Sequence, residues 1–136
     1  MAGQRVTDGV LYRFIPNLAV YWEYDRDRPS PRAFRSRPGE KDGVSMYIEG
    51  HTSVDRLGAL RPSFGIYAID VERLLQEERL SITYDPDETL PEGHAHVTVA
   101  GVNRRVAEWI AREVAYRLNP PGPAVASLTP DIDTTP

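Results

Sequence analysis

The chain of 136 residues contains no cysteine. This absence excludes a disulfide framework, a thiolate zinc site and a cysteine nucleophile together. It fits a reducing compartment, and we expect the protein to be cytoplasmic. Lysine is scarce as well, because 15 of the 16 cationic side chains are arginines and the other is Lys41. This skew is typical of a GC-rich genome, although arginine also suits two-point contacts to carboxylate or phosphate.

Long apolar runs are also absent. No stretch approaches the roughly 18 apolar residues of a membrane span, and the first ten residues, MAGQRVTDGV, lack the apolar segment of a signal peptide. Positive charge is in deficit, with 16 Lys and Arg against 20 Asp and Glu and a net charge of −4. We therefore expect no membrane association and no general affinity for nucleic acid.

Short apolar segments of strand type dominate what is present. A chain of this length fits one domain. Alternating or β-branched segments predict two strands in residues 10–24, broken at Pro16-Asn17, and further strands at 43–50, 63–70, 79–86 and 94–101. Residues 25–42 predict a loop whose only apolar anchor is Ala33-Phe34.

Helices are predicted late in the chain, each after a capping residue. Ser53 is the N-cap of a helix predicted at 53–60. Asp70 caps one at 71–78, and Asn103 caps the longest, at 104–118. The pattern predicts a single α+β domain over residues 1–118, with a mixed or mostly antiparallel sheet and two or three helices on one face. Residues 119–136 hold five of the twelve prolines and predict a disordered tail.

The stretch EGHAHVTVAG, residues 92–101, carries two of the three histidines. Side chains alternate between the faces of a strand, so Ala95, Val97 and Val99 belong to the core. His94 and His96 then share the other face and point to solvent, to a cleft or under a covering loop.

Two chemistries use histidines in such a pattern. A two-histidine phosphoesterase would pair His96 with His51 as general acid and base, with Thr98 and Ser53 holding phosphate. Alternatively, His94 and His96 could supply two ligands of a metal site, with carboxylates nearby in sequence. Each pattern is short, and a solvated strand face explains it better than either chemistry.

Arg13 is unexpected between Leu11 and Ile15 on one strand face. A buried arginine should be paired with a carboxylate or line a cleft. Together with Ser45 it resembles ADP-ribosyltransferases, in which an early-strand arginine grips a nicotinamide dinucleotide and a serine on a following strand supports it. The Gln/Glu-x-Glu element of that family is missing here.

The loop at 25–42 interleaves arginines with Phe34. Arg32, Arg35 and Arg37 could contact an acidic or phosphorylated partner, although the four acidic residues of the loop offset their charge.

Elements spread over residues 11–101 resemble, in their order and spacing, a family of small bacterial proteins with no assigned activity. These are Leu-Tyr-Arg, Ala-Phe, Val-Ser-x-Tyr, Asp-Pro and His-Ala. The resemblance singles out the following residues: Arg13, Phe34, Ser45, Tyr47, Asp85, Pro86 and His94. At His96 the family has an aliphatic residue, so this chain departs from it there.

These observations lead to two functional expectations. The first is a cytosolic bacterial accessory protein that binds another protein, because no complete catalytic constellation is present. The second is a nucleotide-handling enzyme resembling ADP-ribosyltransferase toxins or effectors, with Arg13, Ser45, Tyr47 and His94 around one cleft. The enzyme hypothesis requires these side chains to converge. No cofactor, substrate or oligomeric state follows from the sequence.

Overall fold

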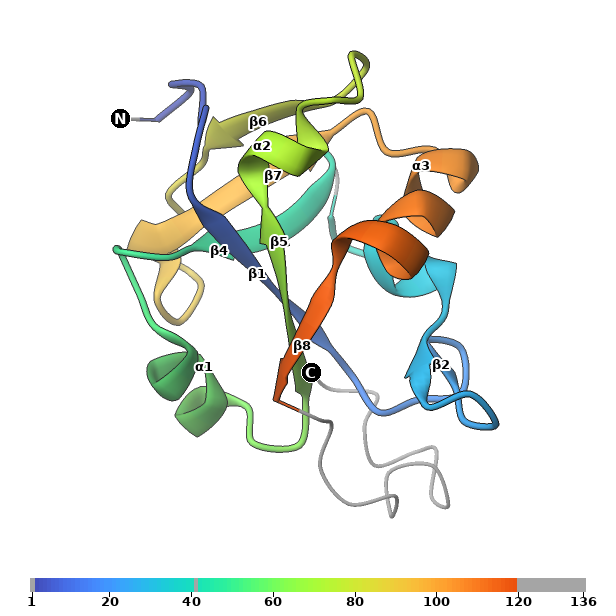
Figure 1. Ribbon diagram of the computed structural model, residues 1–136. Helices are drawn as coiled ribbons and strands as arrows, with labels where there is room; N and C mark the ends of the chain where they lie inside the picture. Colours follow the sequence, from blue (N-terminus) through green and yellow to red (C-terminus); the bar gives the residue numbers. More distant parts are fainter. Residues whose placement is uncertain (1, 41, 120–136) are drawn as a thin grey trace.

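A six-stranded sheet forms the centre of the protein in a computed structural model, which describes residues 2–40 and 42–119 (Figure 1). The strand order is β6-β7-β4-β1-β5-β8, and every neighbouring pair is antiparallel. The strands are β1 (Val10–Ile15), β4 (Val44–Ile48), β5 (Gly65–Asp70), β6 (Ser81–Tyr84), β7 (His96–Ala100) and β8 (Tyr116–Asn119). The α+β prediction is confirmed.

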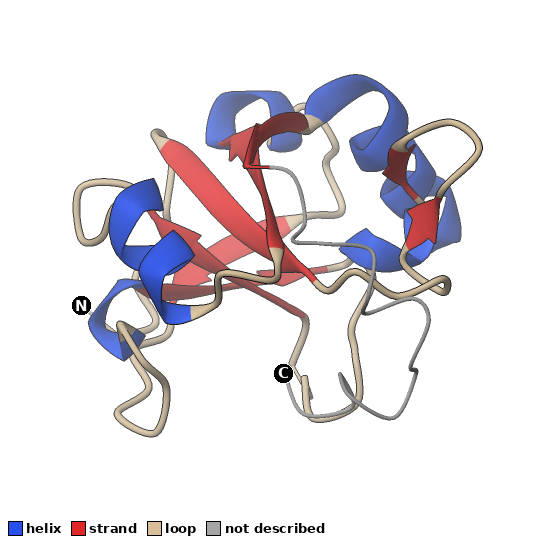
Figure 2. Cartoon of the chain, turned by 90° about the horizontal axis from the view of Figure 1, so that it is seen from below, coloured by secondary structure: helices blue, strands red, loops and turns tan. Residues whose placement is uncertain are grey.

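A small hairpin and several helical segments surround this sheet. The hairpin consists of β2 (Trp22–Glu23) and β3 (Arg28–Pro29). The helices are α1 (Val54–Leu60), α2 (Val71–Leu74) and α3 (Arg104–Trp109), with short turns η1 (Pro31–Phe34), η2 (Gly93–Ala95) and η3 (Ile110–Val114). Seen from below, helices lie on both sides of the strands (Figure 2).

The two faces of the sheet differ in what covers them. The register places Leu11, Arg13, Met46, Tyr67 and Val97 on one face, here called the helix face. Phe34 of η1 packs against Tyr67, and α3 and α2 lie over the same side through η1 and η3. The Ala33-Phe34 anchor of the predicted loop is therefore part of the core, with both residues buried.

The opposite face, here called the pocket face, carries Phe14, Ser45, Tyr47, His96 and Thr98. Among the described residues, only α1 and loops border this face. The α1 helix begins after Ser53, whose hydroxyl accepts a hydrogen bond from the Arg56 N–H, as its sequence position predicts.

The predicted helix at 104–118 is wrong at its end. Asn103 caps α3 by accepting from the Val106 N–H at 2.8 Å. The helix then widens into the π-turn η3, in which the Ala115 N–H donates a hydrogen bond to the Ile110 carbonyl. Residues 116–119 form β8 on β5 instead, because the prolines at 120 and 121 disfavour helix before them. The helix predicted at 71–78 is likewise only one turn, α2.

The predicted tail at 119–136 lies outside the described residues except for Asn119, the last residue of β8. Within the described part of the chain, none of the helices has the length and apolar character needed to cross a bilayer.

Candidate functional site

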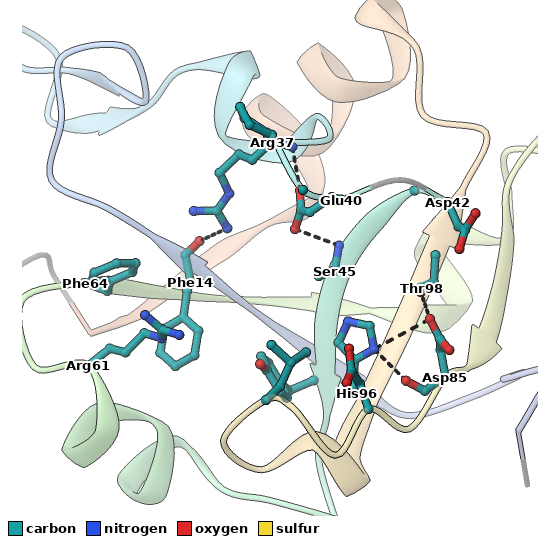
Figure 3. Close-up of a pocket in the computed structure, with 16 residues that line it drawn as sticks. Phe14, Arg37, Glu40, Asp42, Ser45, Arg61, Phe64, Asp85, His96 and Thr98 are labelled. Atoms are coloured by element: carbon teal, nitrogen blue, oxygen red, sulfur yellow. Dashed lines mark hydrogen bonds and ion pairs between the residues drawn. The ribbon is translucent and has the colours of Figure 1, made fainter. Parts of the chain in front are cut away.

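A hollow of about 430 Å³ lies on the pocket face (Figure 3). Its floor consists of Phe14 from β1, Ser45 and Tyr47 from β4, and His96 and Thr98 from β7. Three segments form its rim. They are the loop from Arg37 to Gly43, the α1 end with Arg61 and Phe64, and the loop with Asp85, Asp87 and Leu90.

The hollow exists because β1 and β4 separate. Their pairing covers only Leu11↔Ile48 and Tyr12↔Tyr47, whereas β1 pairs with β5 along its whole length. Continued register would set Phe14 against Ser45. Buried backbone groups left without a ladder partner are costly, so other donors and acceptors must satisfy them.

Side chains fill the gap between these two strands. Arg13 Nη1 donates to the Ser45 carbonyl at 2.8 Å, and the Ser45 N–H donates to Glu40 Oε2 at 3.1 Å. Across the gap, Arg37 Nη2 donates to the Phe14 carbonyl at 2.8 Å. Three charged side chains thus replace the missing rungs of the ladder, and we call this group the clasp.

Arg13 is the centre of the clasp and is fully buried. All five of its N–H groups are used: two reach Glu40, and the others reach the carbonyls of Ala33, Arg35 and Ser45. Burial alone would raise the pKa of Glu40, but the charge and hydrogen bonds of Arg13 outweigh it and lower that pKa below 4.5. Arg13 does not line the pocket; its carboxylate partner explains its burial.

Two other arginines give one end of the pocket a cationic character. Burial, followed by the charge of Arg13, lowers the pKa of Arg37 to about 10, so its guanidinium stays charged at neutral pH. Arg61 lies over the rings of Phe14 and Phe64 at 5.6 and 5.4 Å. Neither guanidinium forms an ion pair with a carboxylate among the described residues.

The other end of the pocket is built around His96. Its Nδ1 donates to the Asp85 carbonyl at 2.7 Å and lies 3.8 Å from Asp85 Oδ2. The Thr98 hydroxyl donates to the same carboxylate at 2.8 Å. Because Nδ1 carries the proton, Nε2 presents a lone pair. This buried Nε2 has no hydrogen-bond partner within residues 2–40 and 42–119, and Figure 3 shows it on the Ser45 side of the ring.

Asp87 adds a second carboxylate to this end of the pocket. The Thr89 hydroxyl and N–H both donate to its Oδ1, and these bonds lower the pKa of Asp87. The pocket is therefore polarised, with Arg37 and Arg61 opposite Asp85 and Asp87.

The other two histidines lie outside the pocket. His94 is exposed in η2, and its Nε2 donates to the His51 carbonyl at 2.7 Å. The ring of His51 stacks on Tyr84 with centroids 5.7 Å apart. His51 and His96 therefore do not face each other across a groove, and Ser53 serves as the α1 cap, so the phosphoesterase arrangement is not assembled.

The metal hypothesis for His94 and His96 also lacks its geometry. The strand begins at His96, so His94 precedes it and does not share its face as we expected. Across residues 2–40 and 42–119, no three His, Asp or Glu side chains gather in a way that could hold a metal ion.

The convergence needed for an ADP-ribosyltransferase-like cleft is only partial. Ser45 and Tyr47 line the pocket, whereas Arg13 is enclosed in the clasp and His94 lies on the outer turn. Of the loop arginines, Arg37 enters the pocket, Arg32 is exposed, and Arg35 contributes its carbonyl to Arg13.

The sequence interpretation missed Arg61, Phe64 and Asp87 as pocket residues. His96 was considered, but the family resemblance directed attention to His94. Strand alternation was the usable signal, because it put His96 and Thr98 opposite the apolar Val97 and Val99. No local signal places Arg61 at the end of a helix next to Phe14.

Comparison of the chain with protein-family models, curated proteins and solved structures finds no significant match. The functional argument therefore depends on the geometry of the pocket.

Proposed function

We propose that this chain is a cytosolic accessory protein that binds a partner through the pocket, where Arg37 and Arg61 take up a carboxylate of that partner. The observation that carries the proposal is this pair of guanidinium groups, which form no ion pair with any carboxylate in the described part of the chain and lie beside an aromatic floor. Arginine binds carboxylates through two parallel hydrogen bonds, which gives such a site both strength and orientation.

A carboxylate suits this pocket better than a phosphate. Asp42, Asp85 and Asp87 also border the hollow, and a doubly charged phosphate would be repelled by them more strongly than a singly charged carboxylate. Glu40 does not cancel the arginines, since Arg13 already neutralises it. A protein partner offers carboxylates at its C-terminus and in its acidic side chains, and the open hollow admits an extended segment.

Titration of the purified protein with short peptides tests this proposal. We expect peptides with a free C-terminal carboxylate to bind, and the same peptides with a C-terminal amide to bind at least about tenfold more weakly, since a hydrogen bond to a charged group contributes about 1.5–3 kcal/mol. Arg61→Ala should remove this difference, because Arg61 is one of the two groups proposed to bind the carboxylate and forms no ion pair with another described residue. Arg104→Ala is the matched control, since Arg104 is exposed and lies on α3.

Nucleotides belong in the same titration. If AMP or NAD binds and none of the carboxylate peptides does, the nucleotide-handling enzyme becomes the better hypothesis, with His96 in the place expected of His94. Equal binding of the carboxylate and amide peptides would contradict the carboxylate proposal.

A further inference from the structure

The unpartnered Nε2 of His96 is the most unusual polar atom of the pocket. The side chain of His96 is only 6% exposed. A buried polar atom without a hydrogen bond is costly and rare in folded proteins, and each case needs a reason. The Asp85 carbonyl accepts a hydrogen bond from Nδ1, so in the neutral ring Nε2 is an acceptor and needs a donor.

The surroundings of Nε2 favour a donor that is cationic. The carboxylates of Asp85 and Asp87 border the same end of the pocket. Asp85 keeps half of its side chain exposed while holding the Thr98 hydroxyl. An ammonium group carries three donors and no acceptor, so it can serve Nε2 and a carboxylate together. A neutral amide could donate a hydrogen bond to Nε2, but the Asp85 and Asp87 carboxylates would not attract it as they attract a cation.

The sheet sets the distance between this end and the arginines. Phe14 lies on β1 and His96 on β7, with β4 between them. Two strand spacings of about 4.8 Å give a lower bound of roughly 10 Å, because β1 and β4 separate here and the register sets His96 level with Tyr12, two residues from Phe14. An extended chain covers about 3.3–3.6 Å per residue, so a segment of at least about three residues is needed to span this distance.

Resting on the proposed carboxylate binding, we propose that the pocket recognises a short zwitterionic peptide segment, with its carboxylate at Arg37 and Arg61 and an ammonium group about three residues away at His96 Nε2. Two sources share this chemistry: a free tripeptide, whose ammonium is its N-terminus, and a partner C-terminus with a lysine near its end.

Four probes test the inference and separate the two sources. Calorimetry would compare trialanine, N-acetyl-trialanine, trialanine amide and an N-acetylated hexapeptide ending in Lys-Ala-Ala. We expect trialanine or the hexapeptide to bind, and the acetylated and amidated tripeptides to bind at least about tenfold more weakly than trialanine. Binding of trialanine alone indicates a free peptide ligand, and binding of the hexapeptide alone indicates a partner C-terminus.

The failures are distinguishable. If acetylation leaves affinity unchanged while amidation abolishes it, the ammonium site is refuted and carboxylate binding stands. If none of the four probes binds, both proposals are refuted.

His96→Asn is the decisive variant, because an asparagine can keep a donor near the Nδ1 position for the Asp85 carbonyl and lacks an acceptor at the Nε2 position. We expect it to fold, as judged by circular dichroism, and to lose about tenfold in affinity for the ammonium-bearing probe. Its affinity for N-acetyl-trialanine should match that of the unmodified protein. Glu88→Gln, in the exposed part of the Asp85–Asp87 loop, is the control. An equal loss for both probes would indicate a purely structural role of His96 and overturn the inference.

Discussion

Arg13 shows how a single side chain can take the place of a strand segment. Its five donors satisfy Glu40 and three backbone carbonyls from separate parts of the chain. A buried ion pair is not by itself a strong source of stability, but removing one partner leaves the other charge buried and unpaired. The sequence indicated only that a buried arginine at this position needs a carboxylate or a cleft; the structure provides Glu40.

Arg13→Met, which keeps much of the side-chain volume, should therefore lower the free energy of unfolding by about 3–5 kcal/mol, because it leaves the Glu40 carboxylate without its ion-pair partner and the Ser45 carbonyl without its donor. Urea unfolding at neutral pH measures this. The double variant with Glu40→Gln should lose less than the sum of the two single variants, since both act on one interaction. A change of less than about 0.5 kcal/mol, as for an ordinary surface substitution, would contradict this role.

Among the elements, the loop before β7 shapes the acidic end of the pocket. The Asp87 N–H donates to the Gly93 carbonyl at 3.0 Å, which draws the two ends of the loop together. Glu92 has the left-handed φ of 55° and is fixed by Arg56 at 2.6 Å and by the Thr52 hydroxyl at 2.7 Å. The bonds from Arg56 and Thr52 lower the pKa of Glu92 to about 2.

Gly93→Ala should disrupt this loop, because the added Cβ would meet the Asp87 backbone carbonyl closer than any non-bonded contact allows. We expect a loss of about 1–3 kcal/mol in the free energy of unfolding, as for an overpacked core site. Peptide binding should also weaken, since Asp85 and Asp87 would shift. Thermal unfolding and the trialanine titration measure the two effects, with Glu88→Ala as the control in the same loop. Unchanged unfolding and unchanged affinity would show that the loop tolerates the methyl group.

Periodicity predicted most of the elements and failed where tertiary pairing decides. The strands at 43–50 and 63–70 and the caps at Ser53 and Asn103 follow from local patterns. Leu118 continues the apolar spacing of the helix, but residues Tyr116 to Asn119 pair with β5 instead. That choice depends on the free edge of a strand some 50 residues earlier in the sequence, which no local window contains.

For the whole molecule, acid should be destabilising through its buried or paired carboxylates. The pKa values of Glu40 and Glu92 lie below their ordinary 4.5 in the folded state. A lowered folded-state pKa means that the stabilisation is fully present above about pH 4.5 and is lost as the pH falls through the folded value.

Thermal unfolding between pH 7 and pH 2 should therefore show a Tm that falls below about pH 4.5. Glu40→Gln should lower the Tm at pH 7 and make the acid-side decline shallower, because one of the titrating groups is gone. Glu88→Gln is the control, since that side chain is exposed to solvent. A Tm independent of pH over this range would contradict the assignment.

The pocket could not be predicted as a whole because four separated segments build it. Ser45, Tyr47 and His96 are recognisable as polar or aromatic residues on strands with an apolar opposite face. Their neighbour Arg61 comes from the end of α1, and Arg37 comes from a loop with mixed charge. The separation of β1 and β4 leaves room for these residues to meet, and Arg13, Glu40 and Arg37 bridge the gap.

The sheet consists of two halves, and the clasp lies at the junction between them. Strands β6, β7 and β4 form one half and β1, β5 and β8 the other, joined by the two residue pairs of the β1–β4 pairing and by side chains. The pocket lies across this seam, with Phe14 on one half and His96 on the other. A ligand that contacts both halves would raise the free energy of unfolding. It would do so at the junction where the sheet has the fewest backbone hydrogen bonds between neighbouring strands.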